Sequence, residues 1–193
     1  MSKFLTEKQI RDAAKRHNLP YAAVKAVIEV ESSGAGFNAD GSPKILFERH
    51  IFWRLLGEIR WYTMRLRIMA LHPRVCNPTP GGYGRYSEQH AKLQTAVSYN
   101  REVALQSCSW GLGQVMGFHW KSLGYKSLQE FVNAMFESEA GQLDAMLRFI
   151  VKNGLAKYLR QEDWAGFASR YNGPAYKKNR YDEKLAAAYR KYQ

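Results

Sequence analysis

The stretch AVKAVIEVESSGAGFNADG, residues 23–41, joins an apolar helical pattern to a glycine-rich turn and holds two glutamates. Positions i, i+3, i+4 and i+7 share one face of a helix. That face carries three apolar residues and then an acid: Val24, Val27, Ile28 and Glu31. The pattern therefore predicts a helix whose apolar stripe ends in a carboxyl group.

The two glutamates differ in what surrounds them. Glu29 lies on another face, four residues after Lys25, and we expect these two side chains to form a solvated ion pair. Glu31 continues the apolar stripe at a helix C-terminus, where burial and the helix dipole both disfavour negative charge. A carboxyl group that keeps its proton near neutral pH suits general-acid catalysis. The alternative is that Glu31 points to water from a frayed helix end.

Composition indicates a folded, strongly cationic protein. The 193 residues are 46% hydrophobic and 13% aromatic, which excludes a disordered chain and allows a sizeable core. The formal net charge of +12 favours anionic partners such as nucleic acid, acidic lipid, lipopolysaccharide or cell-wall polymer. Charge alone does not choose among these partners.

The fold class expected is all-α, with at most a small β-hairpin within residues 36–48, in a single domain over residues 1–193. Capping boxes at Thr6 and Ser127 predict two helix starts, and a continuous helix is expected over 87–107. The second helix is expected to end near residues 32–34, and the last helix to fill 177–191.

Targeting and metal signals are weak in this sequence. Cys76 and Cys108 are too few for a disulfide framework and lack metal-ligand spacing, so no metal and no cofactor are expected. The polar N-terminus lacks the apolar stretch of a signal peptide, which predicts synthesis in the cytoplasm.

Three separated motifs carry a family resemblance: ESSG at 31–34, SWGLGQVMG at 109–117 and ASRYNGP at 168–174. Together with KILFERHIF at 44–52, their identity and order resemble the phage endolysin N-acetylmuramidases, relatives of goose-type lysozymes and lytic transglycosylases. The resemblance implies a lysozyme-like helical fold, and we expect no separate wall-binding domain to fit within 193 residues. It also implies cleavage of the β-1,4 bond between N-acetylmuramic acid and N-acetylglucosamine in peptidoglycan.

The same resemblance assigns roles to individual residues. Glu31 would protonate the glycosidic oxygen, and Ser32 would orient that carboxyl group. The remaining matched positions would line or shape the substrate cleft: Gln114, Tyr171, Asn172 and Gly173. Trp110 either stacks on a sugar face or packs in the core.

A second carboxylate is harder to assign. Glu48, in LFERH, is the first candidate for a catalytic base or nucleophile, and Asp40 is the alternative. Lytic transglycosylases work with one acid and use the sugar's own hydroxyl as nucleophile, so anhydro products stay an alternative outcome. The closer likeness to phage muramidases favours hydrolysis.

The cationic segments suggest further partners. The C-terminal helix and residues 49–74 are rich in lysine and arginine, which suits either ordinary solvated faces or adhesion to outer-membrane lipopolysaccharide. A basic helical nucleic-acid binder, or an inactive wall-binding module, would explain the charge equally well. A nucleic-acid binder does not explain the acid on an apolar face or the three motifs, and the presence of Glu31, Gln114 and Tyr171 together argues against an inactive muramidase-derived module. The prediction is therefore an enzyme that acts on periplasmic peptidoglycan.

Overall fold

The computed structural model describes residues 3–31 and 35–193. The first helix, α1 (Glu7–Arg16), begins at the predicted capping box, in which Thr6 accepts from the Gln9 backbone and Gln9 accepts from the Thr6 backbone. The second helix, α2 (Tyr21–Glu31), ends at the acid singled out above. Its stripe is directed inward, since Val24 and Val27 are fully buried. The predicted end at 32–34 lies outside the described residues.

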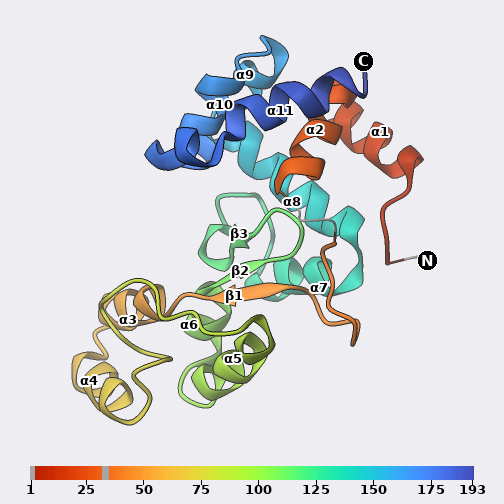
Figure 1. Cartoon of the computed structure of the whole chain (residues 1–193). Helices are drawn as coiled ribbons and strands as arrows, with labels where there is room; N and C mark the ends of the chain where they lie inside the picture. The colour runs from red at the N-terminus through yellow and green to blue at the C-terminus, as the bar shows by residue number, and fades with distance from the viewer. Residues whose placement is uncertain (1–2, 32–34) are drawn as a thin grey trace.

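A small antiparallel sheet crosses the middle of the molecule (Figure 1). Strand β1 (Ile45–Phe47) pairs with β2 (Cys108–Trp110), and β2 pairs with β3 (Val115–Met116). The hairpin expected within 36–48 is reduced to a single bridge between Phe37 and Pro43. The strand at 45–47 instead finds its partner more than sixty residues away, which local sequence patterns do not reveal.

Helices in the middle of the chain lie below and to the left of this sheet in Figure 1. They are α3 (Arg49–Glu58), α4 (Tyr62–Leu71), the 3-10 turn Tyr86–Glu88, α5 (Gln89–Val97) and α6 (Arg101–Gln106). The continuous helix expected over 87–107 is therefore wrong. Asn100 interrupts it, because its side chain accepts from the Val103 backbone N–H at 3.0 Å and starts a new helix.

The C-terminal half supplies the other end of the molecule. It contains the 3-10 turn Gly117–His119, α7 (Leu128–Glu137), α8 (Glu139–Lys152), α9 (Ala156–Arg160), α10 (Trp164–Tyr171) and α11 (Tyr181–Arg190). Helix α7 starts at the predicted Ser127 cap. The last helix begins at Tyr181 rather than 177, because Pro174–Asn179 form a 3-10 segment first. Figure 1 shows α9–α11 beside α1 and α2, with α8 leading from them toward the sheet.

Polar contacts join helices that are distant in sequence. The expected Lys25–Glu29 pair does not form: Lys25 instead binds Glu7 at 2.6 Å, and Glu29 binds Lys191 of the C-terminal segment. Glu7 and Lys191 belong to other segments that pack against α2 and reach these side chains directly. An i, i+4 pair with the lysine N-terminal to the glutamate is the weaker orientation. Among the described residues, no helix is long and apolar enough to cross a membrane.

One carboxylate ties α1 to α8. Asp144 lies 2.9 Å from His17 Nε2 and accepts from Arg148 Nε at 2.7 Å. Burial opposes ionisation of Asp144, but the hydrogen bonds from His17 and Arg148 outweigh it and lower its pKa to about 2.

Candidate active site

Glu31 is the last residue of α2, and its carboxyl group is largely withdrawn from water. Asn172 Nδ2 donates to Glu31 Oε1 at 2.9 Å. Burial raises the pKa of the Glu31 carboxyl, and the Asn172 hydrogen bond and the positive charge of Lys184 only partly offset that rise. Glu31 is thus an acid that holds its proton to a higher pH than an exposed glutamate does.

Two cavities meet at Glu31. One has a volume of about 260 Å³, and its other lining residues are Gly113, Val115, Met116, His119, Phe149, Tyr171 and Asn172. The other, of about 350 Å³, is walled by Ala35, Asn38, Lys44, Tyr86, Gly111 and Leu112. Both share Glu31 and Gln114, so these two side chains mark the point where one groove passes into the other. Glu31 is the sole carboxyl group among the described residues that wall the two cavities.

Gln114 sits in the tight turn between β2 and β3 in a backbone conformation that few side chains adopt. Its φ is +46°, which is uncommon for any residue other than glycine, asparagine or aspartate. Its side chain is fixed at both ends: Oε1 accepts from Ser109 Oγ, and Nε2 donates to the Gly111 carbonyl, each at 2.8 Å. The turn thereby holds Gln114 rigidly at the junction of the two cavities.

Tyr171 and Asn172 end α10 beside Glu31. The Tyr171 ring stacks on Phe167 at 5.1 Å, and its hydroxyl donates weakly to the Gly113 carbonyl at 3.4 Å. Burial and the nearby charge of Glu31 raise the pKa of Tyr171, so the hydroxyl stays neutral. Gly173 follows with φ +82°, which lets the chain turn away directly after Asn172.

Helix α8 contributes a clamp that sequence inspection did not find. Gln142, 1% exposed, accepts from the Leu112 N–H at 2.9 Å and donates to the carbonyls of Gly36 and Met135. Glu139 accepts from the Gly36 N–H at 2.8 Å. These two side chains tie the segment after Glu31 to the turn that carries Gln114.

The clamp explains two glycines in the flanking loops. A Cβ at Gly36 would lie 1.8 Å from Gln142 Oε1, and one at Gly111 would lie 2.5 Å from Gln142 Cδ. Glycine at both positions therefore makes room for the buried amide. The sequence around Gln142 does not reveal this role, because the two loops that Gln142 contacts lie 30 and 106 residues away in the chain.

Other predicted residues lie elsewhere. Of the two alternatives for Trp110, the structure shows core packing: the side chain is 1% exposed, and its Nε1 donates to the Leu105 carbonyl. Trp110 is therefore not available to stack on a sugar. Ser32 lies outside the described residues. Asp40 sits on an exposed turn, where it accepts from the backbone and hydroxyl of Ser42.

Glu48 is not brought to the groove. It precedes the first residue of α3, and its Oε2 lies 3.3 Å from His50 Nδ1. It walls neither cavity beside Glu31. Among the described residues, no cluster of three or more histidine, cysteine, aspartate or glutamate side chains is placed to hold a metal ion.

Glu31 is a partly buried carboxyl group beside two cavities, on a helical fold with a small sheet, and this arrangement suits glycoside hydrolysis. The likeness to known proteins shows that the chain is a lysozyme-type glycoside hydrolase. The family model described as "Muramidase: N-acetylmuramidase" matches residues 20–193, and the chain belongs to this family. The structure titled "Crystal structure of Burkholderia AP3 phage endolysin" is 43% identical, with a TM-score of 0.92 over all of this chain and 73% of that chain. No curated protein matches the chain.

Proposed function

We propose that this muramidase is a phage-type endolysin in which Glu31 is the general acid for cleavage of the β-1,4 bond after N-acetylmuramic acid. The observation that carries the proposal is the carboxyl group of Glu31, which is partly buried and lines both cavities. Burial raises the pKa of Glu31, so its carboxyl group keeps a proton to a higher pH than an exposed glutamate does. Likeness to a Burkholderia phage endolysin supports the biological setting.

The proton would pass from Glu31 to the glycosidic oxygen as the bond from that oxygen to the muramic anomeric carbon breaks. Water then adds to the anomeric carbon, and its second proton restores the Glu31 carboxyl or leaves to solvent. Asn172 positions the carboxyl group, and Gln114 offers a fixed amide at the same junction. Tyr86, 70% exposed in the wall of the larger cavity, offers the aromatic surface that buried Trp110 does not.

Lytic transglycosylation is the second candidate, and one observation favours it. Among the described residues, no other carboxyl group walls the groove, and Glu48 and Asp40 both lie outside it. A second carboxylate is needed to direct water in most glycosidases, whereas a transglycosylase uses a hydroxyl of the muramic acid itself. We therefore assign Glu48 a structural role at the start of α3.

Mass spectrometry of digested peptidoglycan separates these chemistries. Reducing muramic ends mean hydrolysis, and 1,6-anhydro ends mean transglycosylation. Glu31→Gln should abolish both products, and Glu48→Gln should leave product formation within about threefold of wild type if its role is structural. Loss of all activity in folded Glu48→Gln would restore Glu48 as the second catalytic acid.

The cationic surface suggests how the enzyme reaches its polymer. Synthesis in the host cytoplasm and action on peptidoglycan in the periplasm fit an endolysin, and the +12 charge fits adhesion to anionic lipopolysaccharide. Exposed cations along the C-terminal segment supply part of that charge: Lys177, Lys178, Lys184, Arg190 and Lys191. Since exposed charges are screened within about 8 Å at physiological salt, added salt should lower activity on whole cells more than on short soluble glycans. Equal losses on both substrates would contradict the adhesion proposal.

A further inference from the structure

An unusual concentration of exposed apolar side chains lies far from the groove. Ten large hydrophobic residues are exposed in the part of the chain that the structure describes, and half of them fall within thirteen consecutive positions: Ile59, Trp61, Tyr62, Leu66 and Leu71. They belong to the α3–α4 lobe (residues 49–74), which forms the end of the molecule opposite to α9–α11 (Figure 1). Isolated exposed apolar residues are ordinary, but a contiguous group marks an interaction surface.

Helix α4 turns an apolar face outward. Among the elements of the structure, α4 packs mainly on α3, and Ile68 is its one fully buried side chain. The opposite side carries Tyr62, Leu66 and Ala70 at i, i+4 and i+8, all exposed. A helix at a protein surface normally directs polar residues to solvent. Here the solvent side is apolar, and Thr63 and Arg67 flank it.

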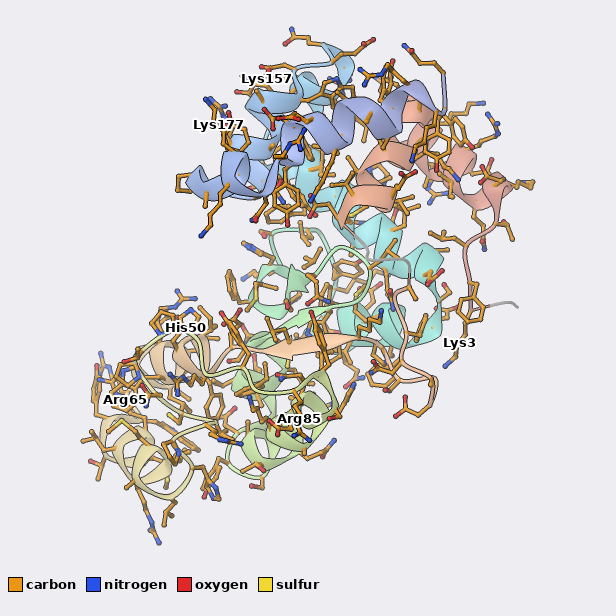
Figure 2. All side chains as sticks on the ribbon, viewed as in Figure 1. Lys3, His50, Arg65, Arg85, Lys157 and Lys177 are labelled. Carbon is orange, nitrogen blue, oxygen red and sulfur yellow. The ribbon has the colours of Figure 1, made fainter. Side chains whose placement is uncertain are left out.

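The arginines of this region divide into structural and available ones. Arg49 donates to the carbonyls of Pro73, Thr79 and Pro80 and so holds the loop after α4. Arg65, which Figure 2 labels, lies over the Trp53 ring at 4.4 Å and so joins α4 to α3. Arg60 and Arg67, by contrast, are exposed and form no ion pair with any described residue.

The sequence places few acidic residues near these arginines, although Arg74 lies 3.8 Å from Glu88. From residue 59 to residue 87 there are five arginines and not one aspartate or glutamate: Arg60, Arg65, Arg67, Arg74 and Arg85. A second copy of the chain would bring like charges face to face in a symmetric dimer, which disfavours self-association through this surface. A nucleic acid would satisfy the arginines but would leave the outward apolar face in water.

An anionic lipid bilayer satisfies both features at once. Its phosphate layer attracts arginine, and its interfacial region accepts tyrosine, tryptophan and leucine side chains. We propose that the α3–α4 lobe is a docking surface for anionic phospholipid bilayers, in which Tyr62 and Leu66 enter the interface and Arg60 and Arg67 bind headgroup phosphates. This surface is separate from the groove at Glu31, so docking is independent of the proposed glycan cleavage.

Vesicle co-sedimentation of the full chain tests the docking surface. Vesicles that contain phosphatidylglycerol should bind the protein, whereas pure phosphatidylcholine vesicles should bind at least about tenfold more weakly. Arg60→Gln/Arg67→Gln should weaken binding about 30-fold, since each arginine near an anionic surface contributes about fivefold. The matched control Lys121→Gln/Lys126→Gln removes two exposed cations elsewhere and should change binding by less than about threefold.

The contribution of the apolar side chains to vesicle binding is tested with one variant in the lobe and one control variant outside it. Tyr62→Ser/Leu66→Ser should weaken vesicle binding by at least about tenfold, because two interfacial side chains are lost. Phe136→Ser/Val151→Ser alters two residues that are 43% and 42% exposed on α7 and α8, and it should leave binding unchanged. Glu31→Gln should bind vesicles as the wild type does, so failure of the proposed chemistry is distinguishable from failure of docking.

A fluorescence measurement avoids dependence on these double variants. Brominated phosphatidylglycerol vesicles should quench the wild-type tryptophan emission, and Trp61→Phe, at the start of α4, should lose that quenching. The proposal is overturned by equal binding to neutral and anionic vesicles, by equal losses in lobe and control variants, or by quenching that survives in Trp61→Phe. Binding to lipopolysaccharide alone, or a dimer that disappears in Tyr62→Ser/Leu66→Ser, would also overturn it.

Discussion

Replacing Gln142 with leucine tests whether the clamp from α8 holds the two loops of the groove in place. Leucine keeps much of the side-chain volume but removes the amide. Two buried backbone groups then lose their partner: the Leu112 N–H at 2.9 Å and the Met135 carbonyl at 2.9 Å. The Gly36 carbonyl loses its 3.3 Å contact with Gln142 but keeps the Lys44 N–H at 2.9 Å. Each stranded buried group costs about 1–3 kcal/mol, and the added apolar contact offsets part of that loss. We expect Gln142→Leu to lower the free energy of unfolding by about 2–4 kcal/mol.

Urea denaturation measures that change directly, and peptidoglycan turnover measures its consequence for the groove. Because the clamped loops carry Gln114 and follow Glu31, the folded fraction of Gln142→Leu should also show a reduced kcat. Gln129→Leu is the matched control, since Gln129 is exposed on α7 and should change stability by less than about 0.5 kcal/mol. A loss below about 1 kcal/mol for Gln142→Leu would refute the clamp.

Three further predictions concern single side chains. Burial raises the pKa of Glu31, so kcat/KM on a soluble glycan should fall with rising pH only above the ordinary range of carboxyl pKa values. Because the Asn172 hydrogen bond lowers this pKa, Asn172→Leu should move that fall to higher pH. The pKa of Asp144 falls from 3.8 unfolded to about 2 folded, so its ion pairs stabilise the protein above pH 4 and are lost as pH drops toward 2. Asp144→Asn should therefore lower the free energy of unfolding by about 2 kcal/mol at pH 7. Thermal unfolding measured at several pH values should show this difference disappear near pH 2. Tyr171→Phe should lower kcat while changing the free energy of unfolding by less than about 1 kcal/mol, because the ring stacking is kept and one weak hydrogen bond is lost.

Local patterns predicted several helix starts and the placement of Glu31 at the end of α2. Apolar spacing in α2 placed Glu31 on the buried stripe, and the Thr6 and Ser127 caps gave helix starts that the structure confirms. These features depend on residues within a few positions of one another, so a sequence displays them directly. The Gly-Leu-Gly-Gln and Tyr-Asn segments, identified by resemblance, do line the groove beside Glu31.

Long-range pairing escaped prediction. Strand β1 joins a partner at 108–110, Gln142 reaches two loops far from α8, and Lys25 prefers Glu7 to Glu29. Each of these contacts depends on how the helices pack in space, and the periodicity of hydrophobic residues along the sequence does not specify that packing. Trp110 illustrates the same limit, since a tryptophan inside a functional motif stacks on ligand or fills the core according to the tertiary fold alone.

The proposed function depends on a proton that the Glu31 carboxyl group donates, and replacing this carboxyl group tests the proposal most directly. Glu31→Gln is close in shape and keeps a polar contact available to Asn172, so circular dichroism and the unfolding transition should match the wild type. Release of new glycan ends from purified peptidoglycan should fall by about 10²–10⁴-fold. A folded Glu31→Gln enzyme that retains activity within tenfold of wild type would contradict the assignment of Glu31 as the general acid.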